Sequence, residues 1–324
     1  DPAFQYGNAG QVTLRAPTVN VTGGGFISTS TETNGAAGAI AFNVGTLNLS
    51  ADGYIISGSV RGSEGLTPTG PAGNVTVQGL ASPAQSLLID GSGSGIFTDT
   101  QGTGAGGNIF VNADSVTLQN GGTLSATTSG TEISATGGNI TIQGSDVQFK
   151  SGAVVTTDTR GAGHGGTIDV VATESLSLKD ASSISSSSNS ELESAGNAGE
   201  IRLNAPVIDV QTALISASTV GPGNAGDIVL EANRVILGAS ETGRLRGNGA
   251  DIFTRTTGPG LAGDITIRGR NGADSQAEIV TISGFSRMNS ESFFGRTDVQ
   301  GDAGNISIHT SRLTLSDGTL STTS

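Results

Sequence analysis

The sequence predicts an all-β protein, a right-handed parallel β-helix (β-solenoid) of about ten coils with three short strands per coil. One observation is a four-residue phrase made of a small residue, a glycine, any residue, and then Ile or Val. The phrase occurs ten times, with its glycines at Gly10, Gly38, Gly73, Gly107, Gly138, Gly166, Gly199, Gly226, Gly263 and Gly304. The other observation is the alternation of apolar and polar residues after each phrase, which is typical of a strand with one buried face.

The intervals between these glycines are those of a stacked repeat protein. The shortest, from Gly199 to Gly226, is 27 residues, and the longest, from Gly263 to Gly304, is 41 residues. A coil of this length cannot bury its apolar face alone and needs a neighbouring coil. We therefore expect residues 1–324 to form one solenoid domain that is a section of a longer fibre. The right-handed preference of parallel crossovers predicts the handedness.

Composition agrees with this class and excludes several others. The chain has 52 Gly and 8 Pro, and it contains no Cys and no Trp. The glycines lack the three-residue period of collagen, and the aliphatic residues are too regularly placed for a disordered chain. A formal net charge of −13 argues against nucleic acid or an anionic membrane as partner. No apolar stretch approaches the roughly 20 residues that cross a bilayer, so no membrane insertion is expected.

The seventh repeat illustrates the three strands of one coil. Residues 200–204 alternate polar and apolar side chains, as a half-buried strand does. A break at Ala205 and Pro206 precedes a second strand at 207–210, and a third follows at 213–219. A turn containing Gly and Pro then leads to the next phrase. Each coil thus has three strands and three bends.

Every repeat supplies equivalent pairs of inward side chains. The first-strand pairs are Val12/Leu14, Ile40/Phe42, Val75/Val77, Ile109/Val111, Ile140/Ile142, Ile168/Val170, Ile201/Leu203, Ile228/Leu230, Ile265/Ile267 and Ile306/Ile308. The second-strand pairs are Val19/Val21, Leu47/Leu49, Leu87/Ile89, Val116/Leu118, Val147/Phe149, Leu176/Leu178, Ile208/Val210, Val235/Leu237, Val280/Ile282 and Leu313/Leu315. These columns are rich in the β-branched residues that favour a pleated, half-buried surface.

The third strand places one aliphatic residue and then one small residue inward. The predicted pairs are Ile27/Thr29, Ile56/Gly58, Ile96/Thr98, Leu124/Ala126, Val154/Thr156, Ile184/Ser186, Ile215/Ala217, Ile252/Thr254, Met288/Ser290 and Leu320/Thr322. The hydroxyls of this column can bond to one another or to nearby backbone. The glycine of the phrase either takes a positive φ or allows close approach of neighbouring coils at a bend.

Insertions interrupt the repeat, and in solenoids they become loops on one face. The extended segments are 59–72, 79–85, 238–247, 268–278 and 285–302. The last of these carries an aromatic and basic cluster, the closest feature to an adhesive patch, made of Arg287, Phe293, Phe294 and Arg296. The alternative is a solvated loop whose phenylalanines fold back onto the rod.

The sequence has no recognisable catalytic constellation, so no catalytic, cofactor-binding or metal-ligating residues are predicted, and we do not expect an enzyme. Asp227 and Asp264 share one repeat position, with Glu200 and Asn305 in the coils on either side. This column is interpreted as an exposed polar column, and weak calcium binding between coils is the alternative. His164 and His309 lie five coils apart and cannot share a site.

The sequence shows incomplete patterns for two further binding functions. Sugar binding generally uses exposed aromatic side chains, and the outward Phe97, Phe110 and Phe253 lie on different coils. Ice binding needs a regular array of Thr, and Phe97, Phe253 and Arg255 interrupt the outward third-strand positions. Neither pattern is complete.

The repeats resemble those of filamentous-haemagglutinin-like exoproteins of the two-partner secretion type, in the form common in large cyanobacterial surface proteins. The matching stretches are 196–201, 223–228 and 301–306, which read Gly-Asn-Ala-Gly-Glu-Ile, Gly-Asn-Ala-Gly-Asp-Ile and Gly-Asp-Ala-Gly-Asn-Ile. The resemblance covers essentially the whole chain. It implies secretion, or display at the surface of a Gram-negative-type bacterium, through an outer-membrane secretion partner. It transfers no catalytic residue.

These observations predict a structural protein, an extracellular or cell-surface β-helical fibre or stalk without a cofactor. The expected partners are further coils, through end-to-end self-association or continuation of the same fibre. The alternative is an adhesin that binds glycans or neighbouring cells through the longer loops 238–247 and 285–302.

Overall fold

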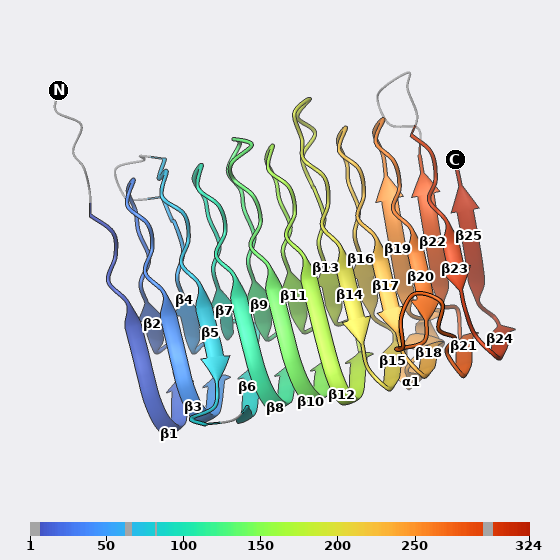
Figure 1. Ribbon diagram of the computed structural model, residues 1–324, viewed down its shortest axis with the longest axis horizontal. Coiled ribbons are helices and arrows are strands. Elements are labelled where there is room, and N and C mark those ends of the chain that lie inside the picture. Colours follow the sequence, from blue (N-terminus) through green and yellow to red (C-terminus); the bar gives the residue numbers. More distant parts are fainter. Residues whose placement is uncertain (1–6, 62–66, 82, 294–300) are drawn as a thin grey trace.

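The computed structural model is an all-β parallel solenoid of about ten coils, which confirms the predicted fold class (Figure 1). It describes residues 7–61, 67–81, 83–293 and 301–324. Equivalent strands of successive coils pair in parallel, so the coils follow one another along one axis from the N-terminal to the C-terminal end. Two sheets run along this axis, one of 15 strands and one of 10 strands.

The first sheet contains both the first and the second predicted strand of each coil. Five coils supply one uninterrupted strand: β1 (Val12–Thr22), β3 (Ile40–Ser50), β8 (Ile109–Gln119), β10 (Ile140–Lys150) and β12 (Ile168–Lys179). The other five supply two strands each: β5 (Val75–Gln78) and β6 (Ala84–Asp90), β14 (Ile201–Asn204) and β15 (Val207–Gln211), β17 (Ile228–Glu231) and β18 (Arg234–Gly238), β20 (Ile265–Arg268) and β21 (Ile279–Ser283), β23 (Ile306–Ile308) and β24 (Leu313–Ser316). The expected break at Pro206 is one of these interruptions.

The second sheet contains the third strand of each coil. Its strands are β2 (Phe26–Ser28), β4 (Tyr54–Ile56), β7 (Gly95–Phe97), β9 (Thr123–Ser125), β11 (Val154–Thr156), β13 (Ser183–Ser185), β16 (Leu214–Ser216), β19 (Asp251–Thr256), β22 (Arg287–Ser292) and β25 (Thr319–Thr323). Tight turns join the two sheets, and several of their residues have positive φ, such as Asn120 and Gly121 at 54° and 86°.

The aliphatic columns form one dry core between the two sheets. Ile140, Ile168 and Ile201 are at most 1% exposed and are paired in register across consecutive coils. In the interior coils the predicted first- and second-strand pairs are buried as expected. Leu313 and Leu315 in the last coil are 45% and 48% exposed, because this coil has a neighbour on one side only in the structure.

Two third-strand pairs were predicted one residue out of register. The inward residues are Ile55 and Ser57 in the second coil, rather than Ile56 and Gly58, and Val155 and Thr157 in the fifth coil, rather than Val154 and Thr156. Each prediction had to choose between two adjacent apolar residues, which alternation alone cannot do. Six positions separate Leu49 from Ile55 and Phe149 from Val155, as they separate Val21 from Ile27, so the turn has the same length in these three coils.

In the coils whose connection is described throughout, the chain continues beyond the second sheet into an arch before it returns to the first sheet (Figure 1). In the fourth coil the arch is residues 126–139, between β9 and β10. This segment and the equivalent described segments of the other coils are called the arch region. It is joined by parallel bridges along a column of buried Ser and Thr, for example Thr100 to Thr128 and Thr128 to Thr159.

The glycine of the repeated phrase allows close approach of the arches. A Cβ added at Gly138 would overlap the carbonyl oxygen of Gly107, and the same holds from Gly166 to Gly138. None of the phrase glycines has a positive φ, so close approach is the correct one of the two predicted reasons. The hydroxyls of the third strand cross to these turns, as Thr98 Oγ1 does when it donates to the carbonyl oxygen of Gly107 at 2.5 Å.

The insertions are partly different from the loops expected. Segment 238–247 contains the short helix α1 (Glu241–Arg246), which begins after the N-cap Ser240 and ends at Gly247 with a φ of 70°. The prediction that segment 285–302 is a loop throughout was wrong, because β22 occupies its first part and pairs in register with β19. Phe294 and Arg296 lie outside the described residues. No described helix has the length and apolarity needed to cross a membrane.

Candidate functional site

The outer face of the second sheet is the most distinctive surface of the solenoid. Its middle coils carry one outward-facing column of small hydroxyl residues, paired in register and made of Ser125, Thr156, Ser185 and Ser216. Larger aromatic residues continue this column on both sides. In the coil before the column, Phe97 pairs with Ser125. In the coil after it, Phe253 pairs with Ser216. Small side chains between large ones leave this part of the face hollow.

The hollow is a polar trough of about 470 Å³ that extends over the third to the sixth coil. Two carboxylates, Asp99 and Asp158, lie in it together with Arg160. The side chains of Thr156 and Ser185 form part of its floor, and Val154 is its apolar member. Because coils stack at about 4.8 Å, the two carboxylates two coils apart are separated by roughly 10 Å along the axis.

Each carboxylate uses one oxygen to hold the next coil. Asp99 Oδ1 accepts hydrogen bonds from Ser125 Oγ at 2.6 Å and from the Thr127 backbone N–H at 2.8 Å. Asp158 Oδ1 repeats the arrangement, accepting from Ser185 Oγ at 2.6 Å and from the Ser187 N–H at 2.7 Å. These bonds fix both side chains on the sheet.

The second oxygen of each carboxylate is little engaged. Asp99 Oδ2 accepts no hydrogen bond from the residues that the structure describes, and Asp158 Oδ2 accepts only a long one, 3.5 Å, from Asn189. Two fixed acceptors therefore remain available in the trough, at equivalent positions two coils apart.

Sequence reasoning missed Asp99 and Asp158. The signal was present, because Thr98-Asp99-Thr100 and Thr157-Asp158-Thr159 are the same tripeptide at one repeat position. The acidic column that the sequence makes most visible is instead that of Asp227 and Asp264, beside the phrase that is the most regular part of the repeat. The error in the register of the fifth coil also placed Val154 rather than Val155 inward and hid the equivalence.

An aromatic cluster borders the N-terminal side of the trough. Phe26 and Tyr54 stack with ring centroids 5.4 Å apart, and Tyr54 meets Phe97 edge-on at 6.5 Å. Glycine at position 95 makes room for this cluster, because a Cβ there would lie 2.6 Å from the ring of Phe97 and 2.7 Å from the backbone oxygen of Thr123. Phe97 is half-buried and outward as predicted, and the coils bring it together with two aromatic residues that the sequence had not singled out.

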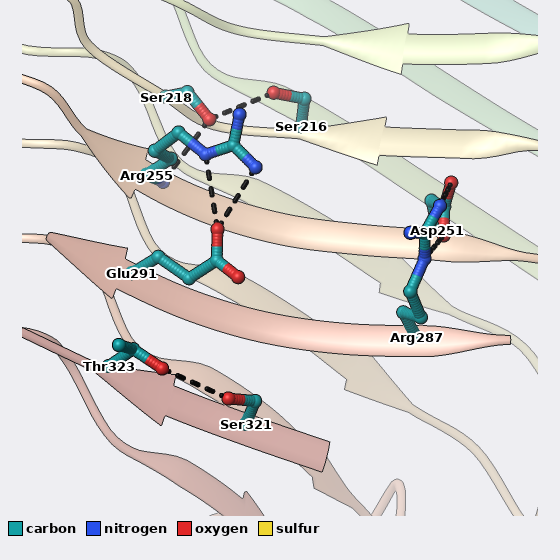
Figure 2. A network of polar contacts seen from close by, with 8 residues as sticks. All are labelled: Ser216, Ser218, Asp251, Arg255, Arg287, Glu291, Ser321 and Thr323. Carbon is teal, nitrogen blue, oxygen red and sulfur yellow. Dashed lines mark hydrogen bonds and ion pairs between the residues drawn. The ribbon is translucent and has the colours of Figure 1, made fainter. Parts of the chain in front are cut away.

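A charged network closes the C-terminal side of the same face (Figure 2). Arg255 donates to Glu291 Oε2 from Nε at 3.2 Å and from Nη2 at 2.9 Å, and its guanidinium lies 5.1 Å from the ring centroids of both Phe253 and Phe293. Arg287 makes two hydrogen bonds to Asp251 across the same pair of strands, and these bonds raise the pKa of its guanidinium. The predicted adhesive residues Arg287 and Phe293 thus take part in internal contacts.

The column of Asp227 and Asp264 is a hydrogen-bonded ladder. Asp227 Oδ1 accepts from the Asp264 N–H at 2.8 Å, and Asp264 Oδ1 accepts from the Asn305 N–H at 2.7 Å. Asn residues do the same in other coils, as when the Asn139 N–H donates to Asn108. These contacts support the polar-column interpretation. Among the described residues, no group of three or more His, Cys, Asp or Glu is suited to hold a metal ion.

The two histidines are placed apart, as predicted. His164 belongs to a second ladder, in which its Nδ1 accepts from the Asn197 N–H at 2.9 Å, and Asn197 accepts in turn from Asn224. This ladder explains the Asn in the Gly-Asn-Ala-Gly sequence. His309 is exposed and directly follows β23. Phe110 is half-buried on the outer face of the first sheet.

A second charged group lies on the outer face of the first sheet. Arg268 donates to Glu231 at 3.0 Å and 2.7 Å, and Asn204 donates to the other oxygen at 2.9 Å. Burial works against the charge of Glu231, but the bonds from Arg268 and Asn204 outweigh it and lower its pKa. Nearby Asp169 is the opposite case, because burial raises its pKa and its Oδ1 has no hydrogen-bond partner among the described residues.

Fold and surface together define a parallel β-solenoid repeat protein with a polar trough along one face. Comparisons with protein-family models, with curated proteins and with solved structures found no match.

Proposed function

We propose that the protein is a structural, filamentous-haemagglutinin-like β-solenoid that serves as an extracellular or cell-surface fibre or stalk. The observation that carries this proposal is the unbroken axial stack of buried aliphatic side chains. Ile109, Ile140, Ile168, Ile201 and Ile228 are each at most 1% exposed and succeed one another in register. A stack of this kind resists bending and separation of coils, because each coil buries its apolar face against its neighbours.

Polar contacts between coils support the same role. The Asn and Asp ladders join coils with one side-chain bond per step, as between Asn74 and Asn108 at 2.8 Å. Ion pairs such as Arg268 with Glu231 add further links between adjacent coils. The chain needs no disulfide for these connections, and it contains no Cys.

Single-molecule force spectroscopy tests the mechanical proposal. A chain pulled from its two ends should unravel coil by coil, in steps of contour length that match the repeat intervals. The variant Ile201→Asp, which places a charge in the core, should weaken or abolish the steps near its coil. Smooth extension of the unaltered chain at forces no higher than those of a disordered chain would contradict the proposal.

Adhesion to glycans or neighbouring cells is a second candidate function, and helix α1 is the feature that favours it. Leu245 is 86% exposed on this helix between two basic residues, Arg244 and Arg246. Cell attachment to immobilised protein should fall in the variant Leu245→Asp. Leu261→Asp, at another exposed leucine in the arch region, is the matched control. Equal attachment by both variants and the unaltered chain would argue against helix α1 as an adhesive contact.

A further inference from the structure

We propose that the trough on the second sheet binds a linear, uncharged polysaccharide strand that lies along the solenoid axis. This inference rests on the proposed surface role and names a ligand class for it. It places glycan contact on the flat side of the rod rather than on the loops 238–247 and 285–302.

The polar groups of the trough match the hydroxyl groups of a sugar chain. Asp99 Oδ2 and Asp158 Oδ2 are fixed acceptors, because the other oxygen of each carboxylate is held by the following coil. Ser125 and Thr127 line the coil between them, Thr156 and Ser185 line the floor beside and beyond Asp158, and a hydroxyl can both donate and accept. Sugar hydroxyls can satisfy all of these groups, since they also act as donors and acceptors. Sites of this kind bind through a few well-placed polar groups.

The aromatic border supplies the apolar contact that sugar rings require. Phe97 adjoins Ser125, which lines the trough, and Tyr54 meets Phe97 from the preceding coil. An aromatic ring presents a flat apolar face to the C–H groups of a pyranose, and Tyr adds a hydroxyl at its edge. The aromatic cluster therefore lies beside the polar trough, next to Ser125.

The spacing and charge of the trough specify the ligand further. Equivalent groups recur at about 4.8 Å along the axis, which is close to the length of one sugar unit in an extended β-linked chain. The two carboxylates exceed the single Arg160 in the trough, and the whole chain has a net charge of −13. An anionic polysaccharide would be repelled, so the neutral class is favoured.

Isothermal titration of the full chain with cellohexaose and mannohexaose tests this proposal. We expect at least one of the two to bind with a dissociation constant below about 1 mM. Hexagalacturonate, a hexasaccharide of acidic sugars, should bind at least tenfold more weakly. Absence of saturable binding by both neutral sugars, or equally strong binding of hexagalacturonate, would overturn the proposal.

Matched variants locate the binding face. Ser185→Phe fills the trough and should weaken binding at least tenfold, and Phe97→Ala should weaken it several-fold. Ser177→Phe makes the same change on the outer face of the first sheet in the same coil, and should leave binding unchanged. Far-UV circular dichroism and melting temperature check that each variant is folded. If Ser185→Phe is folded and binds as the unaltered chain does, the trough is not the site, whereas the mechanical proposal is judged separately by its pulling experiment.

Discussion

The body of the solenoid and its arch region are held together in different ways, although the same coils pass through both. In the body, two sheets enclose aliphatic side chains such as Ile142, Val170 and Leu203, which are not exposed at all. In the arch region, the contacts are between backbone atoms of stacked glycines and between hydroxyls and carbonyl groups, as at Gly107 and Thr98. One region is stabilised mainly by burial of apolar area and the other by close approach and hydrogen bonding.

This difference explains which positions of the repeat are fixed. Several aliphatic and aromatic residues serve in the body columns, as Val77, Phe42 and Ile142 do at one position, because a core tolerates different side chains of suitable volume. The arch has glycine at the phrase position in all ten repeats, and in every repeat after the first a Cβ there would overlap the backbone of the preceding coil. The sequence signature therefore lies in the arch, while most of the buried apolar area lies in the body.

The largest effect is expected in the body. Ile208→Ala would leave a cavity between the two sheets and should lower the free energy of unfolding by about 2–5 kcal/mol. Ile236 points outward on the neighbouring strand β18 and is only half-buried. Ile236→Ala should therefore cost less than about 1 kcal/mol. Denaturant titration measures the free energy of unfolding of both variants. Equal losses of this free energy would mean that the aliphatic stack is not the main source of stability.

The arch should respond to added volume rather than to lost volume. Gly138→Ala forces a methyl group against the Gly107 carbonyl oxygen and should cost about 1–3 kcal/mol, the usual range for overpacking. Gly238→Ala is the control, because its nearest neighbours would lie 3.8 Å and 4.0 Å from the new Cβ, and it should be almost neutral. If thermal unfolding tolerates both alanines equally well, the close packing of the arches is not required.

The fold could be predicted because its two signals are physically strong. Alternation fixes which face of a first or second strand is buried, and the glycine phrase fixes where each coil begins. The register of the third strand could not be predicted at Tyr54-Ile55-Ile56, since both isoleucines satisfy the apolar pattern. The length of the turn does not resolve it either, because seven positions separate Ile89 from Ile96 and only five separate Val210 from Ile215.

The candidate site was harder to predict, because it depends on what small side chains leave open. Ser125 and Ser185 mark no site in the sequence, and they matter only because Phe97 and Phe253 stand at the two ends of their column. Asp99 and Asp158 are 59 positions apart in sequence and two coils apart in space. Alignment of the third strands on the shared Thr-Asp-Thr tripeptide, rather than on the nearest apolar residue, would have placed them at one repeat position.

A smaller effect tests the hydrogen bonds between the body and the arch. Thr98→Val keeps the volume at the inward position but removes the donor to the Gly107 carbonyl oxygen, so unfolding should become easier by about 1–2 kcal/mol. The adjacent coil has Ala126 at this position and offers no replacement hydroxyl. Thr117→Val, on the outer face of β8, should change stability by less than about 0.5 kcal/mol. A neutral Thr98→Val would show that the arch needs only close packing.

The smallest effect concerns Asp169, where the outer face of the body carries a poorly satisfied charge. Burial raises its pKa above 3.8, and Glu200 and Glu231 add to this against the opposing charge of Arg202. The folded state therefore binds the proton more tightly than the unfolded state, so Asp169 lowers stability once the pH is above its folded pKa. Asp169→Asn should raise the free energy of unfolding at pH 7 by less than about 1 kcal/mol. The gain should disappear near pH 3, below the ordinary pKa of the group, whereas the exposed Asp114→Asn should change little at either pH. A gain that persists unchanged at pH 3 would show that the carboxylate charge is not its cause.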